Sequence, residues 1–189
     1  ISARYLATAG HCFNNLSPDI VFHRDCNRPG LCFARVREHD LTRRELGERN
    51  IDIAALHLPP GRDVDLAIVE LSEAVLLDER AQIVKVSTKN LKRGDIVTTV
   101  GWGLAFQSGQ PDELLKAELT VSDVDAAGGF TYTEVGRTQL GNPVDTCAGD
   151  SGGPLLAWRD GAWLLYATLQ GGGYNCEKDK TSGDGVWNS

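Results

Sequence analysis

The sequence predicts an all-β protein built in two halves, and three observations support this fold class. Short runs of β-branched and other apolar residues recur along the 189-residue chain, with turn residues between them. Helical periodicity is almost absent, which favours a barrel or a sandwich over a helical fold. A polar, turn-rich stretch at 87–95 separates the runs into two sets and marks the expected bridge between the halves.

Each expected strand is a short run of this kind, bounded by polar or turn residues. The first set contains five of them, at 5–8, 19–22, 33–36, 51–58 and 66–71. The second set contains seven, at 83–86, 96–100, 114–121, 130–135, 154–158, 163–169 and 186–187. A chain of this length can bury one substantial core or two smaller cores that share an interface.

Composition narrows the classes of partner. The net charge of −7 and the pI of about 5.1 argue against nucleic acid or an anionic membrane as the main partner. No apolar run approaches the ~20 residues that a helix needs to cross a bilayer. The five cysteines form neither a C-x-x-C pair nor a His/Cys cluster at zinc spacing, so we expect no metal site. The function predicted below also requires no cofactor.

The clearest chemical signal lies at 145–154, which reads DTCAGDSGGP. Gly149, Gly152 and Gly153 surround Ser151, and glycine permits positive φ and lets backbone N–H groups approach a ligand closely. The amides of Gly149 and Ser151 can then point at one spot and stabilise a developing negative oxygen. A serine hydroxyl is a weak nucleophile at neutral pH, so this interpretation requires a base and a group that orients it.

Two further segments supply candidates for these roles, TAGHC at 8–12 and DLAIVEL at 65–71. The three segments, in the order His, Asp, Ser, resemble those of the trypsin/chymotrypsin-like serine proteases. The resemblance implies that Ser151 is the nucleophile, that His11 is its general base, and that Asp65 orients the imidazole.

Each of these residues also has a plainer interpretation. Taken alone, His11 is equally typical of a core histidine, and Asp65 is typical of a turn before a strand. Asp63, two positions earlier, competes for the acid role. We prefer Asp65 because the apolar run at 66–71 must follow the acid immediately for the resemblance to hold.

The resemblance also implies a more definite fold. It predicts two antiparallel six-stranded β-barrels that pack together, with the active site at their seam. Either barrel can be incomplete where the chain begins or ends. A single peptidase domain would cover 1–189, with the N-terminal barrel at 1–88 and the C-terminal barrel at 89–189. The family's usual N-terminal segment and C-terminal helix have no counterpart in the sequence, so we expect the chain to be a fragment of a larger protein.

Further positions carry over from the family one by one. Asp145 matches the base of the primary specificity pocket, where an acid pairs with a substrate Arg or Lys, and Gly172 and Gly185 match its walls. The plainer alternative for Asp145 is a turn aspartate. Asp150 matches the acid that forms an ion pair with the N-terminus released by zymogen cleavage. Without such a terminus we expect Asp150 to be unpaired, which is costly for a half-buried charge.

The chain departs from the family at Gln170-Gly171-Gly172, where relatives carry Ser-Trp-Gly. The usual serine hydrogen-bonds the catalytic Asp, and Gln170 can replace that bond. The usual Trp lines the substrate groove, which we therefore expect to be more open.

The resemblance also bears on the cysteines. It implies a disulfide between Cys147 and Cys176, whereas Cys26 and Cys32 would close a short local loop. Cys12 is left over because its usual upstream partner has no counterpart in the sequence.

We therefore predict a secreted, monomeric serine endopeptidase, made as a zymogen. It would cleave protein or peptide substrates after Arg or Lys through an acyl-enzyme intermediate, with protein inhibitors as candidate partners. Two alternatives remain open. One is a catalytically impaired protease-like binding protein, and the other is a serine protease with apolar primary specificity.

Overall fold

The structure, a computed structural model, describes residues 2–13, 32–60, 64–105, 109–134, 136–137, 143–171 and 185–189. Regular structure in these residues is β-strand, apart from the 3-10 turn η1 (Gly10–Cys12). The chain divides into two compact units, Ile1–Val84 and Lys85–Ser189. Each unit has its own sheet and its own hydrophobic core.

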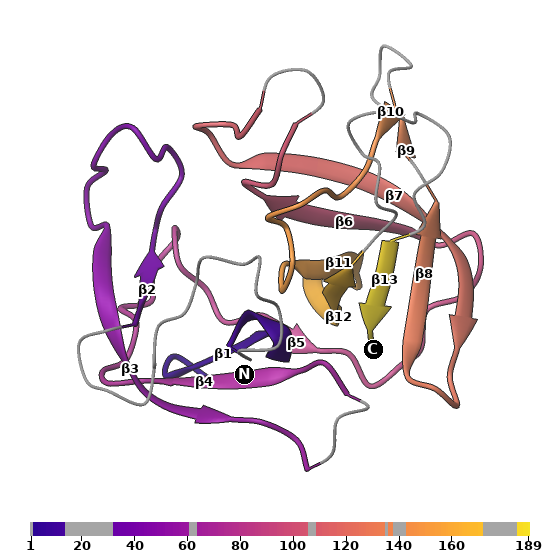
Figure 1. Ribbon diagram of the computed structural model, residues 1–189, viewed down its shortest axis with the longest axis horizontal. Coiled ribbons are helices and arrows are strands. Elements are labelled where there is room, and N and C mark those ends of the chain that lie inside the picture. The colour runs from indigo at the N-terminus through magenta and orange to yellow at the C-terminus, as the bar shows by residue number, and fades with distance from the viewer. Residues whose placement is uncertain are drawn as a thin grey trace. The chain divides into compact units, whose positions relative to one another are not determined.

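The first unit contains a four-stranded antiparallel sheet (Figure 1). Its strands are β1 (Tyr5–Thr8), β2 (Phe33–Val36), β3 (Arg49–His57) and β4 (Ala67–Leu71), in the spatial order β1-β4-β3-β2. The register between β3 and β4 shifts between Ile53 and Ala55. Such a bulge bends a sheet locally, which suits the curled, half-barrel form of this one.

Side chains that point alternately to the two faces of β3 and β4 produce the core of this unit. Ile51 and Ile53 of β3 and Val69 and Leu71 of β4 are spaced two residues apart, and each is at most 8% exposed. A slip of one residue would turn these side chains to the opposite face, so their burial fixes the register.

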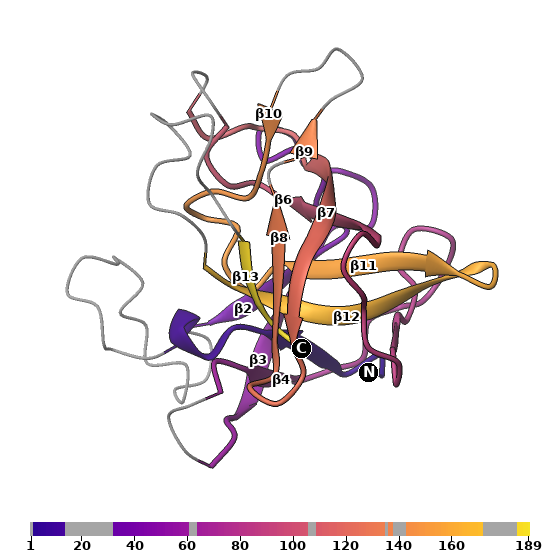
Figure 2. The same ribbon diagram turned by 90° about the vertical axis from the view of Figure 1, so that its right-hand side faces the viewer.

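The second unit contains a closed barrel of six antiparallel strands. These strands, in spatial order, are β6 (Ile96–Gly101), β7 (Leu115–Asp125), β8 (Phe130–Glu134), β13 (Gly185–Asn188), β12 (Ala162–Gly171) and β11 (Pro154–Arg159). The barrel closes because β11 pairs with both β12 and β6. Figure 2 shows β11 and β12 as a long hairpin.

Three short strands lie outside the closed barrel. β5 (Lys85–Val86) pairs in parallel with β12, and β9 (Gly136–Arg137) pairs with β10 (Pro143–Val144). In the interior, Leu119, Leu155 and Trp187 are at most 1% exposed. The indole Nε1 of Trp187 donates to Thr133 Oγ1 at 3.0 Å, so the one polar atom of this large side chain is satisfied within the core.

The structure confirms the all-β fold class. The strand expected at 19–22 lies outside the described residues, and every other expected strand overlaps an observed one. The second barrel has its expected six strands, whereas the described part of the first unit has four. The short strands β9 and β10 were not predicted, and β7 extends beyond its expected end to Asp125.

The stretch at 87–95, expected to bridge the halves, packs with the second unit. Leu91 is 5% exposed in the core of that unit, and Ser87 N donates to Leu165 O at 2.8 Å. The division of a single peptidase domain at residues 88 and 89 stays a prediction.

Candidate active site

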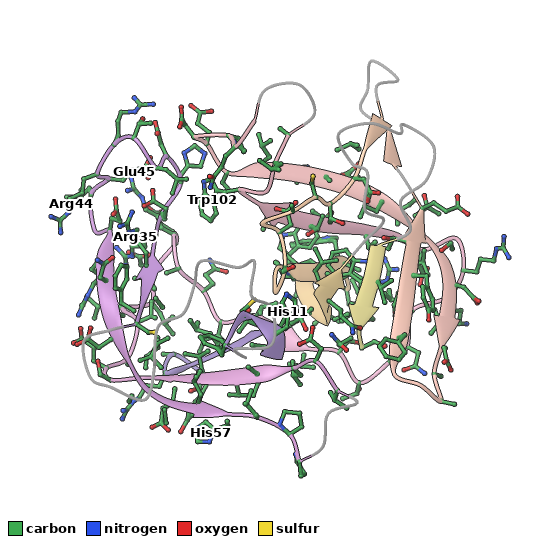
Figure 3. The ribbon with its side chains drawn as sticks, in the orientation of Figure 1. His11, Arg35, Arg44, Glu45, His57 and Trp102 are labelled. Atoms are coloured by element: carbon green, nitrogen blue, oxygen red, sulfur yellow. The ribbon has the colours of Figure 1, made fainter. Side chains whose placement is uncertain are left out.

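His11 and Asp65 are brought together by the pairing of β1 with β4. Because the strands are antiparallel and Thr8 lies opposite Ala67, the residues that follow β1 lie beside those that precede β4. His11 lies in the 3-10 turn after β1 (Figure 3), and its Nδ1 lies 2.6 Å from Asp65 Oδ2. The backbone N–H of His11 donates to Asp65 Oδ1, also at 2.6 Å. One residue therefore engages both carboxylate oxygens.

Gly10 permits this close approach. A Cβ at Gly10 would lie 3.3 Å from both Asp65 Oδ1 and Leu66 O, a tight contact on each side. The side chain of Asp65 is 14% exposed and that of His11 is 33% exposed, so the acid is shielded while the imidazole stays accessible. The carboxylate favours the tautomer with the proton on Nδ1, which leaves the Nε2 lone pair available to accept a proton. This is the geometry of a general base and its orienting acid.

The pKa of His11 is raised from 6.5 to about 9. The largest cause is a hydrogen bond with the Cys12 side chain; partial burial opposes it, and the hydrogen bond with Asp65 adds to it. Both partners stabilise the imidazolium relative to the neutral ring. His11 is therefore mostly protonated at neutral pH while the Cys12 contact persists.

Ser151 lies in a tight loop that leads into β11. Gly149 and Gly152, on either side of it, have φ of 98° and 81°, which favour glycine. Gly152 N donates to Leu169 O at 2.8 Å, and Leu169 N donates to Gly153 O at 2.9 Å. These two bonds join the serine loop to β12.

Backbone amides hold the carboxylate of Asp150. Gly103 N donates to Oδ1 at 2.8 Å, and Cys147 N donates to Oδ2 at 2.9 Å. Hydrogen bonds to an ionised acceptor are stronger than neutral ones, so they stabilise the charge. The sequence predicts a carboxylate without a partner unless a terminal amine meets it, but the structure gives it two amide donors. The ion pair with a released N-terminus stays a prediction.

The sequence analysis missed the role of Gly101 and Gly103. A Cβ at either position would collide with the Asp150 carboxylate, at 2.5 Å from Oδ1 in the case of Gly103. Leu104 N also donates to Ala148 O at 2.9 Å, so the segment that follows β6 is bound to the serine loop in two places. The signal available in the sequence was the Gly-x-Gly spacing, which leaves one side of an extended chain without side chains.

Comparison with known proteins decides the family. The family model described as Trypsin matches residues 1–185. The chain belongs to the trypsin family. It is 29% identical to trypsin-1 of Astacus astacus over 92% of this chain and 75% of that protein. The expected resemblance to trypsin-like serine proteases is therefore confirmed, and these are hydrolases.

Other relatives are longer than this trypsin-family chain. It is 26% identical to CLIP domain-containing serine protease B4 of Anopheles gambiae, over 93% of this chain and 54% of that protein. It is also 26% identical to mannan-binding lectin serine protease 1 of Rattus norvegicus, over 95% of this chain and 28% of that protein. The chain thus spans about half of the first relative and less than a third of the second.

The predicted catalytic residues of the trypsin-family chain are distributed over both units. His11 and Asp65 lie in the first unit, and Ser151 lies in the second. The competing acid, Asp63, lies outside the described residues. That the three residues form a catalytic triad stays a prediction, as does the oxyanion hole at Gly149 and Ser151.

The predicted specificity residues are only partly described. Asp145 directly follows β10 and is half-buried, and its Oδ1 accepts a hydrogen bond from Thr146 N at 2.8 Å. Gly172 lies outside the described residues. The Oε1 atom of Gln170 is buried and has no hydrogen-bond partner in the part of the chain that the structure describes.

Gly185 begins β13 and has a structural reason to be glycine. A Cβ there would lie 2.7 Å from Thr133 Oγ1 and 2.9 Å from Trp187 Nε1, which are bonded to each other. Barrel packing therefore requires the missing side chain, and a role for Gly185 in substrate binding stays a prediction.

The predicted disulfides each have one member outside the described residues. Cys176 and Cys26 are those members, so the pairings with Cys147 and Cys32 stay predictions. Cys12 carries a thiol, and its side chain hydrogen-bonds His11.

Two features are absent from the described residues. They contain no group of three or more His, Cys, Asp or Glu side chains that could hold a metal ion. Nor does any helix among them have the length and apolar character needed to cross a membrane.

Proposed function

We propose that this protein is a serine endopeptidase that hydrolyses peptide bonds after Arg or Lys through an acyl-enzyme intermediate. Membership of the trypsin family supports the hydrolase class. The observation that carries the assignment of the base is the 2.6 Å distance between His11 Nδ1 and Asp65 Oδ2. A carboxylate in this position orients the imidazole and stabilises the imidazolium that forms when the base accepts a proton.

In the proposed reaction, Ser151 Oγ attacks the carbonyl carbon of the scissile bond while His11 Nε2 accepts the hydroxyl proton. The carbonyl oxygen becomes an oxyanion, whose stabilisation we assign to the N–H groups of Gly149 and Ser151. The tetrahedral intermediate collapses as the C–N bond breaks, and His11 gives its proton to the leaving amine. A water molecule that His11 deprotonates then hydrolyses the acyl-enzyme and regenerates the serine hydroxyl.

We assign the preference for Arg or Lys to Asp145 at the base of the specificity pocket, with Gly172 and Gly185 as its walls. Asp145 is half-buried, so a cationic side chain that reached it would lose much of its hydration. A substrate without a cation would leave that carboxylate unpaired, and such a penalty discriminates strongly between side chains.

The test uses the full-length, activated protein, a fluorophosphonate label and matched peptide substrates. We expect one adduct, on Ser151, and none in Ser151→Ala. Asp65→Asn should lower kcat by about 10⁴, because the amide favours the wrong tautomer of the base. Asp63→Asn is the matched control and should leave kcat unchanged.

Each proposed element can fail separately. The absence of an adduct under conditions that label a reference trypsin would overturn the assignment of the nucleophile. Labelling without turnover of any peptide would favour the protease-like binding protein. Turnover with a preference for apolar residues would overturn the role of Asp145.

We also propose that the protein is secreted as a zymogen, acts as a monomer without a cofactor, and is regulated by protein inhibitors. Cysteine pairs support an oxidising compartment if they are bridged, since disulfides persist there. Peptide mapping of the non-reduced protein should recover Cys147 joined to Cys176 and Cys26 joined to Cys32. Other pairings would contradict the proposal.

A further inference from the structure

The hairpin formed by β11 and β12 carries two exposed tryptophans beside its turn. Trp158 of β11 and Trp163 of β12 lie directly opposite each other, and their rings meet edge to face with centroids 5.3 Å apart. They are 54% and 45% exposed. Asp160 and Gly161 have φ of 52° and 81°, as the two central residues of a tight type I′ turn do. Figure 2 shows the hairpin extending beyond β7 and β8 of the same barrel, so the indole pair lies near a projecting tip.

Two aliphatic side chains share this outer face of the barrel. Leu156 of β11 lies opposite Thr98 of β6, so the antiparallel register places Trp158 opposite Ile96, which is 57% exposed. Val86, in the neighbouring strand β5, is 54% exposed. An aromatic side chain has about 150–250 Å² of surface, so the two indoles alone expose about 200 Å². Apolar patches of this order often mark interaction sites. We call these four residues the tryptophan face: Val86, Ile96, Trp158 and Trp163.

The chain that leads into β6 adds positive charge beside the tryptophan face. Residues 85–93 contain four basic residues and no acid, although the whole chain has a net charge of −7. All four are exposed, and their side chains make no hydrogen bond or ion pair with the part of the chain that the structure describes: Lys85, Lys89, Lys92 and Arg93.

An ion pair joins this basic segment to the hairpin. Asp95 Oδ1, two residues after Arg93, lies 3.3 Å from a guanidinium nitrogen of Arg159, the residue that follows Trp158. Salt at physiological concentration screens exposed charges over about 8 Å. The local positive charge, and not the net charge of the chain, therefore acts on a surface that touches the indoles.

We propose that the tryptophan face docks the protein on an anionic lipid surface. Tryptophan favours the boundary between membrane and water, because its ring is apolar while its N–H can remain hydrated. Lysine and arginine beside it are attracted to anionic headgroups. The shape favours lipid over a peptide, since these side chains project from a hairpin whereas peptides dock in grooves. The area favours lipid over a second copy of the chain, because a stable complex buries about 800 Å² on each partner.

The tryptophan face contains none of the residues assigned to catalysis, so docking can be measured apart from hydrolysis. The probe is a suspension of phosphatidylcholine vesicles that contain phosphatidylserine. The full-length protein should sediment with them, should sediment less with phosphatidylcholine alone, and should be released by salt. Tryptophan emission should shift to shorter wavelength as the indoles leave water. A variant that combines Trp158→Phe with Trp163→Phe should lose that shift.

Single substitutions locate the contact. Trp158→Ala should weaken vesicle binding at least about tenfold, because it removes apolar area from the contact. Its matched control is Leu115→Ala, which removes a side chain that is 46% exposed in β7 of the same barrel. Lys92→Gln should weaken binding about fivefold. Lys116→Gln, near the other end of β6, should leave it unchanged.

Asp160→Asn should strengthen binding, which a misfolded variant could not do. The substitution removes the negative charge of the turn, and asparagine is favoured in a type I′ turn. Loss of one charge near an anionic membrane corresponds to about fivefold in affinity. Circular dichroism of every variant checks that it is folded.

Three outcomes would overturn the proposal. The protein could stay in the supernatant at millimolar concentrations of the phosphatidylserine lipid, or Trp158→Ala could bind the vesicles as tightly as Leu115→Ala does. Self-association that Trp158→Ala abolishes, without any binding to vesicles, would assign the tryptophan face to a second copy of the chain instead.

Discussion

Gly103→Ala should loosen the serine loop by pushing on the Asp150 carboxylate. The new Cβ would lie 2.5 Å from Asp150 Oδ1 and closer still to Cγ, whereas real Cβ contacts are essentially never shorter than 3.0 Å. Overpacking of this kind costs about 1–3 kcal/mol, and a weakened hydrogen bond to a charged group costs about 1.5–3 kcal/mol. Relief of the clash lengthens the bond from Gly103 N, so the free energy of unfolding should fall by about 2–4 kcal/mol.

The same displacement should slow the chemistry. Asp150 lies between Gly149 and Ser151, the residues whose amides we assign to the oxyanion, and a misplacement of about 1 Å costs about 10² in rate. We expect the rate of fluorophosphonate labelling to fall about 100-fold in native buffer. Urea denaturation of the same samples gives the free energy of unfolding and shows that the labelled population is folded.

Two comparisons make this test decisive. Gly94→Ala also adds a Cβ, at a φ of 88°, but nothing lies within 4 Å of it, so it should cost only backbone strain and leave labelling unchanged. In an Asp150→Ala background the clash is gone, so Gly103→Ala should cost much less free energy of unfolding than in the parent. Equal losses in the two backgrounds would refute the steric reasoning.

Four further predictions concern single titratable residues. The acidic limb of kcat/KM should lie near pH 9, because His11 acts as a base only when neutral, and Cys12→Ala should move it to lower pH by removing the largest cause of the raised pKa. In unfolding measurements, His11 stabilises the fold below pH 6.5 and loses that contribution as the pH rises through about 9; a pH-independent difference between the parent and His11→Ala would contradict this. Thr42 chiefly lowers the pKa of Asp40 from 3.8 to about 2, so Asp40→Asn should lower stability above pH 3.8, and the two acid-unfolding curves should converge as the pH falls through about 2. Asp145→Ser should abolish the preference for Arg and Lys in a peptide library while labelling of the serine continues, and a retained preference would exclude its role.

The strands that could be predicted are those with one buried face. Ile51 and Ile53, like Val69 and Leu71, repeat at the strand period because one side of the sheet excludes water. β9 and β10 have two residues each, which is too short for any period to appear in the sequence. Their position depends on close backbone approach, since a Cβ at Gly136 would collide with Glu118 O.

In the candidate site, too, the residues could be identified from the sequence, but the contacts between residues far apart in the chain could not. The resemblance assigned roles to His11 and Asp65, and the antiparallel pairing of β1 with β4 explains why residues 54 positions apart meet. The hydrogen bond that holds the Asp150 carboxylate could not be inferred from the residues next to it in the sequence, because the donor, Gly103, lies 47 positions before it. Only the fold shows that a glycine at the end of one strand makes room for a carboxylate in another loop.

The closed barrel and the four-stranded sheet should differ in how they open. Every barrel strand has two neighbouring strands, so its release requires the backbone hydrogen bonds to both of them to break. In contrast, β1 and β2 each have one neighbouring strand among the described residues. Amide hydrogens of β6 and β7 should therefore exchange with deuterium more slowly than those of β1. His11 lies in the 3-10 turn that follows β1, so we expect partial melting at this edge to displace the base of this protein before it disturbs the closed barrel, whose strand β11 follows the serine loop.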